Sequence, residues 1–149
     1  MTRRQTGPEQ WLIADLRLGA ELWPALRRLA RGSGVLLLRK LDAGEWRRIR
    51  HLARLRHLTV IDDASAVRVH DLRELSRALS RRGPLILISP IHATRSHPDW
   101  IPMPRMRAAA LARLTGRKAI ALGGMNAQRY ARIARLGFIG WAGIEAFRT

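Results

Sequence analysis

The chain has 149 residues and a formal net charge of +17 at pH 7, and 47% of its residues are hydrophobic. This length suits one domain, and the apolar content is sufficient for a sizeable core. The absence of cysteine excludes disulfides and thiolate zinc sites. No apolar run is long enough to span a bilayer, and the N-terminal residues lack the apolar segment of a secretory signal. We therefore expect a flexible tail over residues 1–9, one domain over residues 10–149, a cytoplasmic location and no membrane partner.

The hydrophobic pattern predicts strands and helices that alternate along the chain. In chain order we expect a strand at 11–18, a helix at 20–30, a strand at 35–39, a helix at 42–56 and a strand at 58–61. The segment 66–69 is ambiguous between a strand and a loop. A helix at 71–81, a break at Gly83-Pro84, a strand at 85–88, a loop at 89–104 and a helix at 105–114 follow. A strand at 119–122, a helix at 126–136 and a strand from Phe138 complete the series.

This alternation is typical of an α/β fold with a parallel sheet, and in a closed ring it would be a (β/α)₈ barrel. Such barrels take roughly 200 to 250 residues, which exceeds this chain. Between Asp63 and Ala66 there is no room for a crossover helix, because a crossover takes about ten or more residues. Either a βα unit is missing after the third strand, or residues 66–70 form a loop. We predict a shortened or incomplete TIM barrel with about seven parallel strands.

A missing unit would leave either two strand edges without partners or a tighter, strained closure. Unpaired edges are prone to aggregation unless they are covered. A second copy of the chain is a common cover, usually with two-fold symmetry. We therefore predict a homodimer or a covering segment at the gap.

The positive charge is carried almost entirely by arginine, since only Lys40 and Lys118 are lysines. A basic face would favour nucleic-acid binding. The arginines are spread over several predicted helices instead of one tract, which favours a generally basic surface. Such a surface also attracts small anionic ligands such as phosphates. An arginine-rich domain associated with nucleic acid is therefore a third alternative, behind the two functions developed below.

Residues 118–144 contain the most informative local pattern. The apolar run 119–122 ends at Gly123-Gly124, Asn126 is a good cap for the next helix, and Gly137 ends that helix. Two strands joined by one helix form a parallel crossover unit. Ligands of parallel sheets bind at the carboxyl ends of the strands, and glycine there lets backbone N–H groups approach a phosphate. The same glycines could also serve only the geometry of tight turns.

Four segments carry a resemblance to a known family. Residues 89–97 read Ser-Pro-Ile-His-Ala-Thr-Arg-Ser-His, residues 121–125 read Ala-Leu-Gly-Gly-Met, an apolar strand covers 138–144, and Val69-His70 ends the ambiguous segment. They resemble, in turn, the Gly-Pro-Val-Phe-x-Thr-x-Thr-Lys loop, the Ala-Ile-Gly-Gly-Ile strand end, the last strand and the Ser-x-His strand end of the thiamine-phosphate synthase/TenI family of TIM barrels. The resemblance covers about residues 66–147 and is weak before them.

The resemblance implies a reaction in which an aminopyrimidine pyrophosphate is joined to a thiazole phosphate, with Mg²⁺ and with release of pyrophosphate. Such chemistry needs cations to neutralise the leaving group and a backbone cradle for the other phosphate. By resemblance, catalytic roles fall to His97, Arg39, Thr94 and Ser96. Substrate binding falls to His70, Ser89, Gly123, Gly124, Ala142 and Gly143, and Mg²⁺ ligation to Asp62 and Asp63.

The sequence also departs from the family pattern. His97 stands where the family has a lysine, so that a fixed charge becomes a titratable one. Of the family's Gln-x-Arg-x-Lys pattern, only the arginine is present, as Arg39. The βα unit that carries the family's second metal-binding aspartate has no counterpart in this sequence. Arg39 could instead form a salt bridge with Asp62 or Asp15, and the aspartate pair could be a helix cap or turn. The alternative function is a non-catalytic phosphate-ligand-binding or regulatory protein on the same scaffold.

Overall fold

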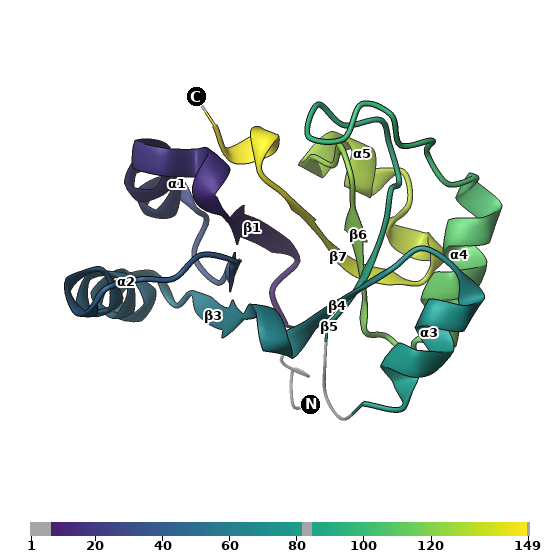
Figure 1. Cartoon of the computed structure of the whole chain (residues 1–149), viewed down its shortest axis with the longest axis horizontal. Coiled ribbons are helices and arrows are strands. Elements are labelled where there is room, and N and C mark those ends of the chain that lie inside the picture. Colours follow the sequence, from purple (N-terminus) through teal and green to yellow (C-terminus); the bar gives the residue numbers. More distant parts are fainter. Residues whose placement is uncertain (1–6, 82–84, 149) are drawn as a thin grey trace.

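The computed structural model describes residues 7–81 and 85–148 and contains a single parallel sheet (Figure 1). The strands are β1 (Gln10–Ala14), β2 (Gly34–Leu37), β3 (Thr59–Asp62), β4 (Ala66–Val69), β5 (Leu85–Ile88), β6 (Ala119–Leu122) and β7 (Phe138–Gly143). Their order in the sheet is β3-β2-β1-β7-β6-β5-β4, and every neighbouring pair is parallel. The predicted α/β class, with seven parallel strands in an incomplete barrel, is confirmed.

The sheet is interrupted between β3 and β4, which are its two edge strands. Only the 3₁₀ turn Asp63–Ser65 joins them, so no crossover helix separates these two strands. The ambiguous segment 66–69 is therefore a strand, and its partner is β5. The sheet curls but does not close as an eight-stranded barrel. Association of two copies across this seam stays a prediction.

Helices lie along the outside of the curled sheet, with α1 and α2 on one side and α3 and α4 on the other (Figure 1). Their bounds are α1 (Leu22–Arg28), α2 (Ala43–Arg56), α3 (Leu72–Leu79), α4 (Arg105–Leu114) and α5 (Ala127–Ala131). The predicted caps are confirmed, because the side chains of Asp42, Asp71 and Asn126 each accept a hydrogen bond from a backbone N–H in the first turn. The hydrogen bond from Glu74 also lowers the pKa of Asp71 below its ordinary value.

Three apolar clusters fill the spaces that the sheet creates. Alternate strand residues point to opposite faces, so one cluster lies inside the curl and two lie beneath the helices. Inside the curl are Trp11, Ile13, Leu36, Leu87, Ile120 and Ala142. Leu12, Leu26 and Val35 belong to the cluster that includes α1 and α2 residues, and Ile88, Leu111 and Trp141 to the cluster that includes α3, α4 and α5 residues.

Two predicted elements have different bounds in the structure. The strand expected at 11–18 ends at Ala14, because the Asp15 side chain accepts a hydrogen bond from the N–H of Arg17 and starts a 3₁₀ segment over Leu16–Glu21. The helix expected at 20–30 then begins at Leu22. The helix expected at 126–136 is interrupted after Ala131 and resumes as a 3₁₀ turn before Gly137. Of the expected tail, residues 1–6 lie outside the described residues, as does the break at Gly83-Pro84.

Candidate functional site

A cavity of about 540 Å³ lies at the carboxyl ends of β1, β5, β6 and β7. This is the edge of a parallel sheet where ligands generally bind. Its wall combines glycine turns, small hydroxyl side chains, arginines and one tryptophan. The residues that the argument uses are Asp15, Arg17, Arg68, Ser89, Thr94, Arg95, Ser96, His97, Trp100, Gly123, Gly124, Met125, Arg129, Gly143 and Glu145.

The Gly123-Gly124 turn forms the floor of this cavity and also contacts the loop that follows β5. Gly123 has φ +103° and Gly124 has φ +56°, a backbone region that favours glycine. The N–H of His92 donates to the carbonyl oxygen of Gly123 at 3.0 Å. A Cβ atom on Gly124 would overlap the carbonyl oxygen of Ala93. The turn geometry and the close approach of the loop therefore both require glycine here, whether or not a ligand binds.

The same turn leaves backbone donors unused. Within residues 7–81 and 85–148, the N–H groups of Gly124 and Met125 donate no hydrogen bond. Gly143 lies nearby, since a Cβ atom on it would be 3.4 Å from the carbonyl oxygen of Met125. Gly143 has no positive φ, and a Cβ atom at this position meets only ordinary van der Waals contacts. The predicted pair of glycine turns thus lines one cavity.

Four arginines give the cavity a positive charge. The Nε of Arg17 lies 3.4 Å from a carboxylate oxygen of Asp15, and Arg129 donates to the carbonyl oxygen of Gly124. Arg68 and Arg95 form no ion pair with any residue of the described chain.

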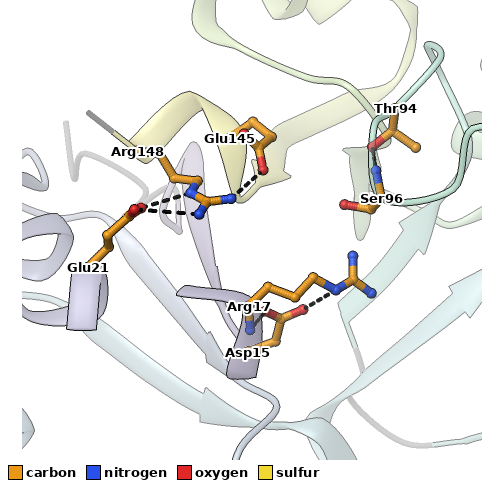
Figure 2. Close-up of polar contacts among 7 residues, drawn as sticks. All are labelled: Asp15, Arg17, Glu21, Thr94, Ser96, Glu145 and Arg148. Carbon is orange, nitrogen blue, oxygen red and sulfur yellow. Dashed lines mark hydrogen bonds and ion pairs between the residues drawn. The ribbon is translucent and has the colours of Figure 1, made fainter. Parts of the chain in front are cut away.

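The two carboxylates of the cavity wall are already neutralised. Asp15 pairs with Arg17, and Glu145 accepts a hydrogen bond at 3.0 Å from Arg148, which also binds Glu21 (Figure 2). The hydrogen bond from Arg148 lowers the pKa of Glu21 below its ordinary value. The remaining electrostatic field of the cavity therefore favours an anion.

The loop after β5 supplies the polar and aromatic wall. Thr94 Oγ1 accepts a hydrogen bond from the N–H of Ser96 at 3.3 Å, and Figure 2 draws these two residues above the guanidinium end of the Arg17 side chain. The His97 ring stacks on Trp100, with ring centroids 4.0 Å apart and an angle of 8° between the planes. Trp100 is 40% exposed. A flat, partly open aromatic surface therefore borders the positive cavity.

Seven of the predicted site residues line this cavity, namely Ser89, Thr94, Ser96, His97, Gly123, Gly124 and Gly143. Two others lie close by without lining it. Ala142 is buried in the cluster inside the curl. The Nδ1 of His70 lies 2.7 Å from the carbonyl oxygen of Ser89, and the His70 ring contacts Trp100 edge-on at 5.5 Å.

Arg39, Asp62 and Asp63 do not line the cavity. Arg39 forms a 2.6 Å salt bridge with Glu45 of α2, in place of the Asp62 or Asp15 partner considered from the sequence. Asp62 accepts a hydrogen bond from the hydroxyl of Ser65 at 2.9 Å, and Asp63 begins the 3₁₀ turn of the seam.

Both carboxylates of this cavity are paired with arginines. The described ranges contain no group of three or more His, Asp or Glu side chains that could hold a metal ion. Mg²⁺ ligation by Asp62 and Asp63 stays a prediction.

The four arginines of the cavity were not anticipated as ligand contacts, namely Arg17, Arg68, Arg95 and Arg129. Arg68 lies on β4, where Val67 and Val69 face the outer helices, so the alternation of strand residues turns Arg68 inward. The inward position of Arg68 can be predicted from the sequence only if residues 66–69 are assigned to a strand. Arg17 comes after β1, which ends at Ala14. The apolar pattern predicts a strand as far as residue 18, so it gives no sign that the chain turns before Arg17.

His92 lies beside the glycine turn and is partly buried. Burial is the main cause that lowers the pKa of His92 below its ordinary value, and the positive charges of Arg129 and Arg132 act in the same direction. The neutral form of this imidazole is therefore favoured in the folded chain.

No protein-family model, curated protein or solved structure matches this chain. Among the helices of the described residues, none has both the length and the apolar character needed to cross a membrane.

Proposed function

We propose that this protein binds a phosphorylated small molecule in the cavity at the strand ends, with thiazole phosphate as the ligand that the family resemblance implies. One observation carries the proposal. Unused backbone N–H groups of the glycine turn share a cavity with arginines that have no carboxylate partner in the described chain. Backbone donors and guanidinium groups together are a common arrangement for holding phosphate.

In this proposal the phosphate contacts the N–H groups of Gly124 and Met125 beside Gly143. Arg95 supplies positive charge from the loop after β5, and Arg129 fixes the glycine turn through its hydrogen bond to Gly124. The ring of the ligand contacts the His97–Trp100 pair. The cavity volume of about 540 Å³ is within the range of small-molecule sites.

Condensation with an aminopyrimidine pyrophosphate is the reaction that the resemblance implies for this site. Arg68, which has no carboxylate partner in the described chain, is a cation available to a pyrophosphate there, and Arg17 is a second one that is shared with Asp15. Ligand binding without turnover is the second candidate. The non-catalytic alternative is favoured because Arg39, Asp62 and Asp63 lie outside the cavity. Their counterparts in the family bind the pyrophosphate and the metal.

Isothermal titration calorimetry with thiazole phosphate tests the binding proposal. In Gly143→Asp the new carboxylate repels the phosphate, and the position accepts a Cβ atom without a clash. We expect at least tenfold weaker binding, which corresponds to about 1.4 kcal/mol. Gly7→Asp is the matched control, because it adds the same charge at an exposed position with open space. Equal affinity of both variants and the unaltered protein would contradict the proposal.

A second measurement separates the two candidate functions. The unaltered protein is incubated with thiazole phosphate, the aminopyrimidine pyrophosphate and Mg²⁺, and pyrophosphate release is followed. Release that depends on both substrates supports the synthase reaction. Binding of thiazole phosphate without release supports the non-catalytic alternative.

A further inference from the structure

The outer face of α1 and α2 is strongly basic and lies outside the cavity. Seven arginines of these helices and the adjoining turn are exposed, namely Arg27, Arg28, Arg31, Arg47, Arg48, Arg50 and Arg54. The two helices are neighbours in space: Arg48 of α2 lies over the Trp23 ring of α1, and the Arg56 side chain donates to the carbonyl oxygen of Leu29. Figure 1 shows both helices on the same side of the sheet. We refer to these seven arginines as the α1–α2 arginine face.

The carboxylates near this face are already engaged. Glu21 binds Arg148, Asp42 caps α2, and Glu45 pairs with Arg39. None of the seven arginines forms an ion pair with another described residue. The face therefore carries positive charge that the described part of the chain does not neutralise.

Several of these guanidinium groups are held in place without losing their charge. Arg48 lies 4.1 Å from the centroid of the Trp23 ring, and Arg50 lies 5.6 Å from that of Trp46. Arg28 and Arg31 each donate to a backbone carbonyl oxygen at 3.2 Å. Aromatic rings and carbonyl groups orient a guanidinium group but leave its charge available. This ordering lowers the entropic cost of binding an anion.

The spacing of the arginines suits an extended polyanion. Arg47, Arg50 and Arg54 are about one helical turn apart, and a turn rises about 5.4 Å. Helix α2 has 14 residues and is therefore about 21 Å long. Duplex DNA carries about one negative charge per 1.7 Å of its axis, so several phosphates fall within that length. A single small anion would engage only part of the face.

We propose that the α1–α2 arginine face binds the phosphate backbone of nucleic acid without reading its sequence. Arginine is well suited to this role, since its planar guanidinium forms paired hydrogen bonds with phosphate. A helix that lies on a membrane needs a broad apolar face. Of the exposed positions on α2, Leu55 is the one large hydrophobic residue among the described residues, which favours nucleic acid over a lipid surface.

Fluorescence anisotropy with a labelled 20-base-pair DNA duplex and a labelled single-stranded RNA tests this proposal across a range of salt concentrations. The test variant carries Arg47→Gln, Arg50→Gln and Arg54→Gln. The control variant carries Arg73→Gln, Arg77→Gln and Arg81→Gln, three exposed positions in or next to α3, so both lose the same charge. Far-UV circular dichroism checks that each variant is folded.

We expect the unaltered protein to bind at least one of the two probes. The α2 variant should bind at least tenfold more weakly, and the slope of log affinity against log salt concentration should become smaller in magnitude by about 2 to 3. The affinity of the control variant should change less than threefold. Equal losses in both variants would assign binding to the general charge and overturn the proposal. If the protein binds neither nucleic-acid probe at low salt, the proposal is also overturned. The same holds if the protein binds phosphatidylglycerol vesicles through the α2 arginines but binds neither probe. Titration of the α2 variant with thiazole phosphate is a separate readout, because none of its three positions lines the cavity.

Discussion

The carboxyl ends of β6 and β7 leave backbone donors and charged groups open to a ligand, whereas at those of β2 and β3 the Nη2 of Arg39 and the Asp62 carboxylate have partners within the chain. The buried Nε of Arg39 is an exception, since it has no hydrogen-bond partner in the described residues. After β6, the N–H groups of Gly124 and Met125 have no partner in the described residues. After β2 and β3, Arg39 is paired with Glu45 and Asp62 with Ser65. Both regions place charged or polar residues at strand ends, but the 540 Å³ cavity is lined by the first and not by Arg39, Asp62 or Asp63.

The seam explains part of this difference. With only a 3₁₀ turn between β3 and β4, no crossover helix or long loop follows β3. The residues at the β3 end therefore serve the turn itself. By contrast, β5 is followed by a loop that lies over the Gly123-Gly124 turn and contributes Thr94, Arg95 and Ser96 to the wall. Position at a strand end is not sufficient for a site; the loop that follows must also enclose space.

The largest effect should follow substitution within the glycine turn. In Gly124→Ala the new Cβ overlaps the Ala93 carbonyl oxygen, and φ is +56°. We expect the free energy of unfolding to fall by about 2 to 4 kcal/mol. Urea denaturation measures this change. Gly143→Ala is the control and should stay within about 0.5 kcal/mol of the unaltered protein; an equal fall in both variants would show that the loop does not constrain Gly124.

A cross-comparison of arginines sharpens the contrast between the two regions. Arg95→Gln should weaken thiazole phosphate binding about tenfold, since a charged partner of the ligand is removed, and should leave stability nearly unchanged. Arg39→Gln should do the reverse. It breaks a partly buried salt bridge, so the free energy of unfolding should fall by about 1 kcal/mol with unchanged binding. Calorimetry and denaturation of both variants test this, and a loss of binding in Arg39→Gln would place the ligand near β2.

A smaller effect should appear in the pH dependence of stability. The pKa of His92 is lowered in the folded chain, mainly by burial, so this side chain binds its proton more readily when unfolded. Its contribution to stability is therefore complete above the ordinary value of about 6.5 and is lost as pH falls through the lower folded pKa. Melting temperatures between pH 8 and pH 5 should fall less steeply for His92→Gln. Identical slopes would show that His92 does not contribute.

Local patterns allowed the glycine-rich part of the site to be predicted from the sequence. Strand 119–122, the Gly123-Gly124 turn and the Asn126 cap depend on neighbouring residues, and the structure has all three. Partner choice could not be predicted in the same way. From the sequence, several carboxylates were possible ion-pair partners of Arg39. The packing of α2 against the sheet determines that the partner is Glu45.

The failure to predict the cavity arginines from the sequence has a related cause. Leu16 and Leu18 continue the apolar alternation of β1, so the pattern hides the cap at Asp15 that turns Arg17 toward the cavity. Four residues at 66–69 were too few to distinguish a strand from a loop by pattern alone. Pairing with β5 makes them a strand and gives Arg68 its inward position.

A crystal structure of the protein with thiazole phosphate would test the central claim most directly. The account predicts phosphate oxygens within hydrogen-bonding distance of the N–H groups of Gly124 and Met125, beside Gly143, with Arg95 of the β5 loop contributing positive charge to the same cavity. A phosphate bound at the ends of β2 and β3, near Arg39 and Asp62, with the glycine turn unoccupied, would contradict it.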